Sequence, residues 1–413
     1  MRSRCTAVLV VVGALFLSPD REILSANRTP LSPFLVLGDS IPAGFQNFSL
    51  LDVQQQNSAA ALIAAQARIA LDLPLVPYPG IPNVLMLVSP GPPPVVEPVP
   101  GPPPAFPRVN PLVQATNLAV PGHTVADAIG KRPTLAPASL TDVLTNVVLG
   151  FPTPFGLPGP SRSQLETAVA LAPNLILLWI GNNDAIGAAV SGDPTALTPL
   201  ASFAAAYEHL TQSLAATNAQ MVFVNIPDVT LAPFFTSVPT LAAQTGLPAT
   251  AIVALLGIGP GDLLRPGALP IAFAILSNQI AGPLPSMCPS IVPGDATLVP
   301  CVLSATDAAA IRSRVAAYNR VIADRAARWG AAYVDIAALV ANLSAHGYSI
   351  REQILTTAYL GGLFSLDGLH PSYTGHAILA NEILDQMKRQ LQINLPKVNV
   401  AQIAKDDPLV IGQ

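Results

Sequence analysis

The sequence predicts an α/β fold in which helices cover a single parallel sheet. Five short apolar runs are continuous rather than alternating, and Gly, Pro, Asn or Asp residues bound them. This pattern is typical of parallel strands that are buried on both faces. Stretches with a helical pattern lie between the runs. Strands that alternate with helices in this way usually form one parallel sheet between helical layers.

The predicted elements follow one another in a regular order along the chain. The expected strands are residues 34–38, 115–120, 174–181, 221–226 and 332–336. The expected helices are residues 58–71, 200–217 and 307–330, each between two strands, and 374–391 after the last strand. We expect these elements to form one domain at 31–395, followed by a C-terminal tail at 396–413.

Two long segments interrupt this order. Residues 74–111 contain fifteen prolines, including "GPPPVVEPVPGPPPAFP". Proline neither continues a helix nor donates to a sheet, so we expect a polyproline-like excursion over the surface; a ligand for a proline-binding domain is the alternative. Residues 231–305 are apolar pieces broken by Gly and Pro. They predict short helices packed on the domain, which form either a lid or pocket wall, or additional core.

Composition excludes several classes of function. The chain of 413 residues is long enough for one elaborated domain or two. Only 11% of its residues are charged, its net charge is −4 and its aromatic content is 5%, so nucleic acid is not an expected partner. No CxxC pair, HExxH motif or His/Cys cluster is present, so no metal or other cofactor is expected.

The N-terminal residues predict export. Arg2 and Arg4 precede an apolar run from Ala7 to Leu17, and a polar break follows at residues 18–21. Eleven apolar residues are too few to span a bilayer, which takes about 20, whereas this order of charge and apolar run is that of a secretory signal. We expect a signal peptide at 1–26, cleaved near Ala26, and a periplasmic or extracellular protein without a stable membrane span. A short uncleaved anchor is the alternative.

The cysteine count fits an exported protein. Once the signal peptide is removed, Cys288 and Cys301 remain, separated by twelve residues. An even cysteine count in an oxidising compartment predicts a disulfide, which contributes on the order of 3 kcal/mol by loop entropy. Two buried free thiols are the alternative.

Candidate chemical groups follow the predicted strands at their carboxyl ends, where ligands bind in open α/β sheets. Ser40 stands in "GDS" after the first strand, Gly122 in "VPGH" after the second, and Asn183 in "GNND" after the third. Taken alone, these residues are an ordinary helix cap, a turn glycine and a turn asparagine.

An aspartate and a histidine stand close together near the C-terminus. Asp367 and His370 occur in "SLDGLHPSYTGHAIL", three residues apart, a spacing that places both side chains on one side of a helical turn. A carboxylate on one imidazole nitrogen lets the other nitrogen accept a proton from a serine hydroxyl. As an isolated pair, they are more often a surface interaction.

In this order, the four blocks resemble the SGNH, or GDSL-type, hydrolase family, whose motifs carry Ser, Gly, Asn and His. The flanking text "GDSIPAGFQN", "NIPDVT" and "DGLHPSYTGHAILANEIL" fits as well, with Ile41 where the family has Leu. The resemblance covers residues 34–73, 114–230 and 306–390. It implies a three-layer α/β/α sandwich with a five-stranded parallel sheet, the flavodoxin-like SGNH hydrolase fold.

The resemblance also implies residue roles. Ser40 is the expected nucleophile, His370 the general base and acid, and Asp367 the residue that orients His370. The backbone N–H groups of Ser40 and Gly122 and the side-chain amide of Asn183 form the expected oxyanion hole. Asp39 and Asp184 match motif positions with a structural role. His123 is a candidate to line the pocket, and His209, His346 and His376 are expected to be surface or packing residues.

The expected function is an exported serine ester hydrolase, carboxylesterase-like or lipase-like, that works through an acyl-enzyme on a small-molecule or lipid-like ester. The apolar segment 231–305 favours acyl chains. The alternatives are a carbohydrate O-acetyl esterase and a non-catalytic binding module on the same fold. Oligomeric state has no signal in the sequence.

Overall fold

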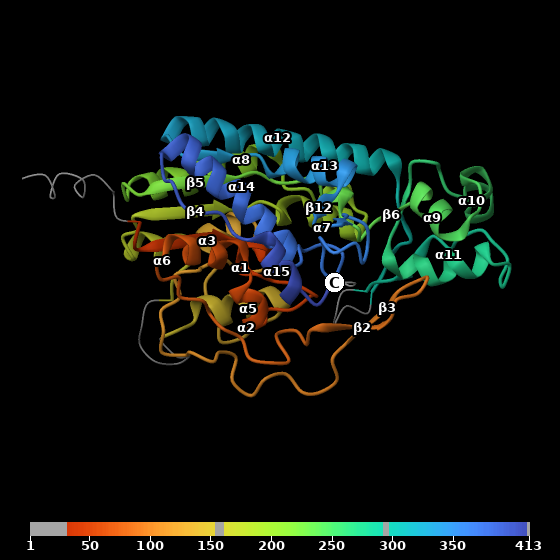
Figure 1. The fold of residues 1–413 in the computed structure, drawn as a ribbon, viewed down its shortest axis with the longest axis horizontal. Helices are drawn as coiled ribbons and strands as arrows, with labels where there is room; N and C mark the ends of the chain where they lie inside the picture. The colour runs from red at the N-terminus through yellow and green to blue at the C-terminus, as the bar shows by residue number, and fades with distance from the viewer. Residues whose placement is uncertain (1–30, 153–160, 292–296, 411–413) are drawn as a thin grey trace, which may run out of the picture. The chain divides into compact units, whose positions relative to one another are not determined.

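A parallel sheet of four strands lies at the centre of the computed structural model, which describes residues 31–152, 161–291 and 297–410 (Figure 1). The strand order is β1–β4–β5–β11, and every pairing is parallel. The strands are β1 (Phe34–Gly38), β4 (Leu175–Trp179), β5 (Gln220–Val224) and β11 (Ala332–Val334). Each begins within one residue of its predicted start. The α/β fold with one parallel sheet is therefore confirmed.

The predicted fifth strand, residues 115–120, is the exception. It lies beside β1 but forms only one isolated parallel bridge, between Asn117 and Val36. The backbone N–H of Val36 donates to Thr116 O at 3.0 Å, and the N–H of Leu118 donates to Val36 O at 2.8 Å. The Asn117 side chain accepts the N–H of Ala119, a local hydrogen bond that competes with a regular ladder. The sheet thus has four strands rather than five, with this segment along its β1 edge.

The four predicted helices are confirmed. They are α3 (Ala59–Ala67), α8 (Leu200–Ala215), α12 (Ala305–Trp329) and α14 (Tyr373–Leu391). α14 packs on α3 and β11, whereas α12 packs on α8, β5 and β11 (Figure 1). α3 and α14 cover one face of the sheet, and α8 and α12 cover the other. The chain passes from β1 to residues 115–120 in one direction across the sheet and then returns past β1 to β4. Because the crossovers are right-handed, this reversal of direction moves the later connections to the opposite face. The result is a three-layer sandwich.

Shorter helices lie in the connections between these elements and after α14. They are α1 (Ser40–Ala43), α2 (Asp52–Gln56), α4 (Val125–Gly130), α5 (Leu140–Leu149), α6 (Gln164–Ala170), α7 (Asn183–Ser191), α13 (Ile336–His346) and α15 (Val400–Asp406). Three of them begin with a capping box, in which the N-cap hydroxyl and an acidic residue at N3 satisfy each other's backbone N–H groups. A hairpin of β12 (Tyr348–Ile350) and β13 (Gln353–Leu355) follows α13.

The proline-rich segment differs from the expected polyproline excursion. It contains an antiparallel hairpin of β2 (Leu85–Ser89) and β3 (Val95–Pro98). A two-stranded hairpin consists only of edge strands, which tolerate proline, and three consecutive prolines lie in the connection between the strands. The prolines therefore shape the turn and the strand end rather than prevent pairing.

The apolar segment 231–305 forms short helices, as predicted, with a small hydrophobic core of their own. Its elements are α9 (Val238–Thr245), α10 (Ala249–Leu256), α11 (Leu269–Leu276), the sheet of β6 (Thr236–Ser237), β7 (Leu263–Leu264) and β10 (Val302–Leu303), and the hairpin of β8 (Met287–Pro289) and β9 (Leu298–Pro300). Cys288 and Cys301 form the predicted disulfide, and both are buried in this second core. The segment thus contributes additional core.

Three further expectations concern the chain ends and the membrane. The predicted signal peptide at 1–26 lies outside the described residues. In the described part of the chain, no single helix is long and apolar enough to cross a membrane; α9 and α10 reach that length only as a pair bent by 109°. Residues 396–410 of the expected tail include α15, which packs on α14 with Val400 and Ala404 buried.

Candidate active site

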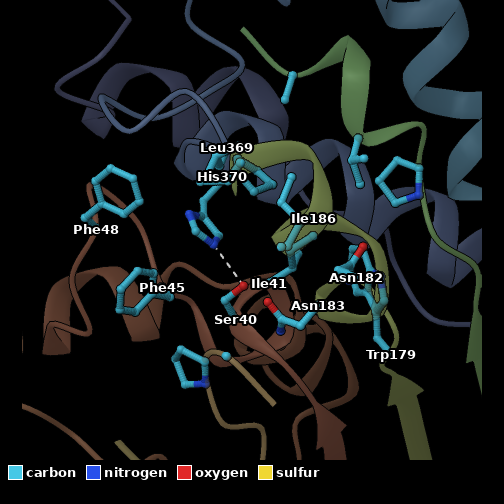
Figure 2. Close-up of a pocket in the computed structure, with 18 of the residues that line it drawn as sticks. Ser40, Ile41, Phe45, Phe48, Trp179, Asn182, Asn183, Ile186, Leu369 and His370 are labelled. Atoms are coloured by element: carbon cyan, nitrogen blue, oxygen red, sulfur yellow. Dashed lines mark hydrogen bonds between the residues drawn. The ribbon is translucent and has the colours of Figure 1, made fainter. Parts of the chain in front are cut away.

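The structure brings three predicted site residues into one chain of hydrogen bonds. The imidazole Nε2 of His370 lies 2.8 Å from Ser40 Oγ (Figure 2). Its Nδ1 lies 2.9 Å from Asp367 Oδ2. Ser40 and His370 are each 9% exposed and Asp367 is 2% exposed. Since the two nitrogens of one ring bond different partners, His370 links a buried carboxylate to the hydroxyl of Ser40, which lies 330 residues from His370 in sequence.

A sharp turn at the end of β1 places Ser40. A Cβ atom at Gly38 would lie 2.2 Å from the carbonyl oxygen of Trp179 on β4, so only glycine fits there. Asp39 follows as the N-cap of α1, with its carboxylate accepting the N–H of Ile41 at 3.3 Å. Ser40 is therefore the first residue of a one-turn helix, and its own N–H has no helical acceptor.

Four donors hold the Asp367 carboxylate. The backbone N–H groups of Leu369 and His370 donate to Oδ1 at 2.8 and 2.9 Å, and the N–H of Phe48 donates to Oδ2 at 2.9 Å beside the imidazole. Burial by itself raises the pKa of Asp367. The charge of His370 and these hydrogen bonds outweigh burial and hold the pKa below its ordinary value. The carboxylate is thus kept ionised next to the imidazole.

The predicted oxyanion-hole residues line the same pocket as Ser40. Among the described residues, the backbone N–H groups of Ser40 and Gly122 donate to no protein acceptor. Gly122 has φ +87°, and a Cβ atom there would lie 2.6 Å from Thr141 Oγ1. The Asn183 amide donates to the carbonyl oxygen of His123 at 3.0 Å, which leaves its second N–H for a ligand. Figure 2 shows Asn183 and Ser40 at the same end of the pocket.

Asp39 and Asp184 connect these loops, as expected for structural residues. The Asp39 carboxylate accepts the backbone N–H of Asn182 at 3.2 Å and its side-chain amide at 2.9 Å. Asp184 accepts the N–H of Val125, three residues after Gly122, at 3.0 Å. Burial raises the pKa of each carboxyl to about 6. The strand-end loops of Ser40, Gly122 and Asn183 are thus tied to one another.

Buried Gln164 and His123 also connect the Ser40 and Gly122 loops. The sequence analysis identified His123 but missed Gln164. The Gln164 side chain on α6 accepts the N–H of Gly38 and donates to its carbonyl, both at 3.0 Å. It also bonds His123 Nδ1 at 2.9 Å, while His123 Nε2 bonds Thr145 at 2.8 Å. Burial lowers the pKa of His123 to about 4. His123 therefore braces the Gly122 loop from behind, and the prediction that it lines the pocket is wrong.

The pocket beside Ser40 has a volume of about 330 Å³. Its walls are mostly apolar. They include Leu140 and Leu144 of α5, Ile186 and Val190 of α7, and Ile336 and Val340 of α13. From segment 231–305, only Ala232 at its start lines the pocket. The pocket wall therefore comes from the sandwich itself rather than from the apolar insertion.

The other histidines are packing or surface residues, as expected. His209 and His346 are exposed, and His376 is fully buried in α14. Nδ1 of His376 accepts the backbone N–H of Ala59 at 3.3 Å, at the start of α3. Burial, together with the charge of His370, lowers the pKa of His376 to about 3. A neutral imidazole is thus part of the packing between α14 and α3.

His376 is expected to make the protein less stable in acid. An unfolded histidine binds a proton near pH 6.5, whereas folded His376 stays neutral down to about pH 3, so the free energy of unfolding falls as pH falls below 6.5. Between pH 6.5 and 4.5 this loss is about 2 kcal/mol. The raised pKa values of Asp39 and Asp184 have the opposite effect, since they increase the free energy of unfolding as pH falls. The contribution of His376 is therefore measured by comparing the wild type with a variant that lacks this histidine.

His376→Asn keeps an acceptor for the Ala59 N–H and removes the titrating group. Urea unfolding at pH 7 and at pH 4.5 measures the difference for both proteins. We expect the free energy of unfolding of the variant to fall by about 2 kcal/mol less than that of the wild type over this interval. If the free energy of unfolding falls equally in both proteins, His376 is not the group that destabilises the protein in acid.

Comparison with known proteins agrees with this geometry. A family model described as GDSL-like Lipase/Acylhydrolase matches residues 34–383. No curated protein matches the chain. Within the described residues, no group of three or more His, Cys, Asp or Glu side chains is placed to hold a metal ion. The family model spans most of the chain and includes Ser40, Gly122, Asn183 and His370, so the chain belongs to the GDSL-like lipase/acylhydrolase family.

Proposed function

We propose that this protein is an exported serine ester hydrolase that forms an acyl-enzyme at Ser40. The observation that carries the proposal is the hydrogen-bond chain from Ser40 Oγ through His370 to Asp367 at the wall of an apolar pocket. A serine hydroxyl is a weak nucleophile until a neighbouring base accepts its proton. Here the base is already within hydrogen-bond distance, and a buried carboxylate orients it.

The proposed reaction has two halves. His370 Nε2 accepts the hydroxyl proton while Ser40 Oγ bonds to the ester carbonyl carbon, and the carbonyl oxygen becomes an oxyanion. The tetrahedral intermediate then collapses, and the alcohol leaves with the proton from His370. Water next attacks the acyl carbon while His370 Nε2 accepts a proton from it. The bond between the acyl carbon and Ser40 Oγ then breaks, the proton passes from His370 to Ser40 Oγ, and the carboxylic acid is released. Asp367 stabilises the imidazolium in both halves.

The negative oxygen is stabilised by three donors on three loops. Ser40 and Gly122 contribute backbone N–H groups that have no acceptor among the described residues, and Asn183 contributes its second amide N–H. The carboxylates of Asp39 and Asp184 and the amide of Gln164 hold these loops together before substrate binds. Donors fixed in advance need no reorganisation when the charge develops.

The pocket supports acyl-chain esters as substrates. Its volume of about 330 Å³ lies at the lower end of the range of about 300 to 1,000 Å³ that is typical of small-molecule pockets, which suits an acyl chain of medium length. Apolar walls from α5, α7 and α13 bury such a chain without unpaired polar groups. The reason to expect acyl specificity is therefore the pocket formed by helices of the sandwich, and not the insertion at 231–305.

Export is the second part of the proposal. The charged and apolar N-terminal residues have the order of a signal peptide, and a disulfide is typical of an oxidising compartment. N-terminal sequencing of the mature protein tests this part, with a start near residue 27 expected and a start at Met1 against it.

A series of nitrophenyl esters of rising chain length tests the substrate class. We expect the wild type to prefer medium chains over acetate. Ile186→Trp adds bulk inside the pocket and is expected to lower kcat/KM for the longer esters by about tenfold, with acetate little affected, because one or two excluded methylenes each cost about 0.8 kcal/mol.

Ile354→Trp is the matched control, because Ile354 lies on β13, is 62% exposed and does not line the pocket. This variant is expected to keep the wild-type chain-length profile. An acetate optimum in the wild type contradicts the acyl-chain proposal and favours a carbohydrate O-acetyl esterase. If Ile186→Trp keeps the wild-type chain-length profile, the pocket does not determine the chain-length preference.

A further inference from the structure

The turn at Gln46–Ser49 contacts residues 365–367, here called the acid loop. Apart from the Phe48 N–H, this turn has no role in the mechanism above. The backbone N–H and O atoms of Gln46 and Ser49 bond to each other in both directions, at 3.0 and 2.9 Å. The two central residues, Asn47 and Phe48, both have φ +51°. Positive φ at both centres is the geometry of a type I′ hairpin turn, in which Asn is common first and Gly second. Phe48 thus occupies a position that favours glycine.

This strained turn directs three groups at residues 365–367. Asn47 Oδ1 accepts the N–H of Leu366 at 2.7 Å, and the Asn47 N–H donates to Ser365 Oγ at 3.1 Å. The N–H of Phe48 donates to Asp367 Oδ2, the same oxygen that contacts His370 Nδ1. The acid loop is therefore fixed to the segment that follows the nucleophile helix α1.

The proline-rich segment supports the turn from its other side. The N–H of Leu85, at the start of β2, donates to Asn47 O at 3.1 Å, and Leu50 and Ile81 exchange two backbone hydrogen bonds at 3.0 and 3.1 Å. A Cβ atom at Gly80 would lie 2.0 Å from Ser49 Oγ. The turn is thus enclosed between the proline-rich segment and the acid loop, so it cannot move without breaking contacts to one of them.

We propose that Asn47 is a positioning residue for Asp367: it holds the turn at residues 46–49 against Ser365 and Leu366, and so keeps the Asp367 carboxylate aligned on His370 Nδ1. The proposal rests on the proposed esterase function. Asn47 does not line the pocket, so it acts through the acid rather than on the substrate. A misaligned acid slows proton transfer at His370 without changing how the ester is bound, which separates the effects on kcat and KM.

Asn47→Gly is the test variant, because glycine accepts positive φ and keeps the backbone contacts while the side-chain acceptor is lost. For a medium-chain nitrophenyl ester at pH 8, we expect kcat to fall by about tenfold and KM to stay within about twofold. Asn47→Asp retains an oxygen acceptor and is expected to restore kcat to within about threefold of the wild type. Downfield proton NMR is expected to show the His370 Nδ1–H signal weakened in Asn47→Gly and retained in Asn47→Asp.

Asn218→Gly is the matched control, since Asn218 is an exposed asparagine with φ +60° in the loop before β5, at the amino ends of the strands and not at the carboxyl ends where the site lies. It is expected to leave kcat unchanged. An unchanged kcat in Asn47→Gly, a loss confined to KM, or a loss that Asn47→Asp does not rescue overturns the proposal. If Asn47→Gly does not fold, Ser365→Ala is the test variant, because it removes the hydroxyl that accepts the Asn47 N–H. A fall in kcat with an unchanged KM supports the proposal, and an unchanged kcat contradicts it.

Ser40→Ala separates the two proposals. If Ser40→Ala retains esterase activity, the proposed function itself fails. If Ser40→Ala is inactive and Asn47→Gly has the wild-type kcat, only the positioning role fails.

Discussion

Ser40→Ala is expected to lower kcat for nitrophenyl ester hydrolysis by at least about 10⁴-fold. In the proposed mechanism the hydroxyl oxygen forms the acyl-enzyme, and no other side chain occupies its place beside His370 Nε2 in the described structure. The oxyanion donors remain in the variant, so a small residual rate over the uncatalysed reaction is expected. His370→Ala is expected to cause a loss of similar size, because triad residues act as a unit.

A fluorophosphonate probe distinguishes this loss from simple unfolding. The probe phosphonylates an activated serine, and mass spectrometry of the digested wild type is expected to show one adduct, on Ser40. Ser40→Ala is expected to take up no probe, and His370→Ala is expected to react far more slowly. An adduct on another residue, or an active Ser40→Ala protein, contradicts the mechanism.

The stability of the Ser40→Ala variant provides the control. The side chain of Ser40 makes its hydrogen bond to His370 Nε2, and Asp39, not Ser40, caps α1. We therefore expect the urea midpoint of Ser40→Ala to stay close to that of the wild type. A loss of activity with an unchanged midpoint then reports on chemistry rather than on folding.

The sequence predicted the central strands because their signal is local and strong. β1 and β4 are buried along their whole length, and their continuous apolar runs are found without knowledge of partners. The segment at 115–120 has a similar composition, but the Asn117 side chain bonds the backbone nearby and leaves one bridge instead of a ladder. An apolar run alone does not show that a side chain within it competes for backbone groups.

The candidate site was predicted through its motifs, whereas its supporting residues were not. Ser40, Gly122, Asn183 and His370 occur in short blocks in a fixed order. Gln164 lies in no such block, yet it bonds Gly38, 126 residues away. Contacts of this kind depend on which helix the fold brings behind a loop. A single sequence gives no signal for them, and the same holds for the turn at Asn47.

Composition left the role of each insertion open. Segment 231–305 is strongly apolar, which predicted either a lid or pocket wall or additional core, and its apolar residues pack on one another in a second core around the disulfide. The proline-rich segment looked like a surface excursion, but Gly80, Ile81 and Leu85 contact the turn next to the candidate active site. Apolar composition predicts burial, not which surface is buried against which.

Asn183→Ala is expected to lower kcat by about 10²- to 10³-fold with little change in KM. In the proposed mechanism the amide N–H stabilises the oxyanion, which exists only after attack. Its loss is therefore expected to raise the free energy of the transition state by about 2.7 to 4 kcal/mol and to leave ground-state binding intact. Asn183→Asp is expected to lose at least as much, because a carboxylate has no N–H to donate and adds a negative charge beside the oxyanion. Steady-state kinetics on a medium-chain nitrophenyl ester measure both variants.

Asn182 provides the neighbouring control, since both asparagines follow β4 and line the same pocket. The amide of Asn182 donates to the buried Asp39 carboxylate, whereas that of Asn183 donates to a carbonyl on the Gly122 loop and keeps one N–H free. Asn182→Ala removes a hydrogen-bond donor from the buried Asp39 carboxylate, which is expected to lower the free energy of unfolding by about 1 to 3 kcal/mol. We therefore expect a clearly lower urea midpoint. Asn183→Ala is expected to keep the midpoint and lose kcat. If the two substitutions have the same effect on both quantities, the assignment of Asn183 rather than Asn182 to the oxyanion is wrong.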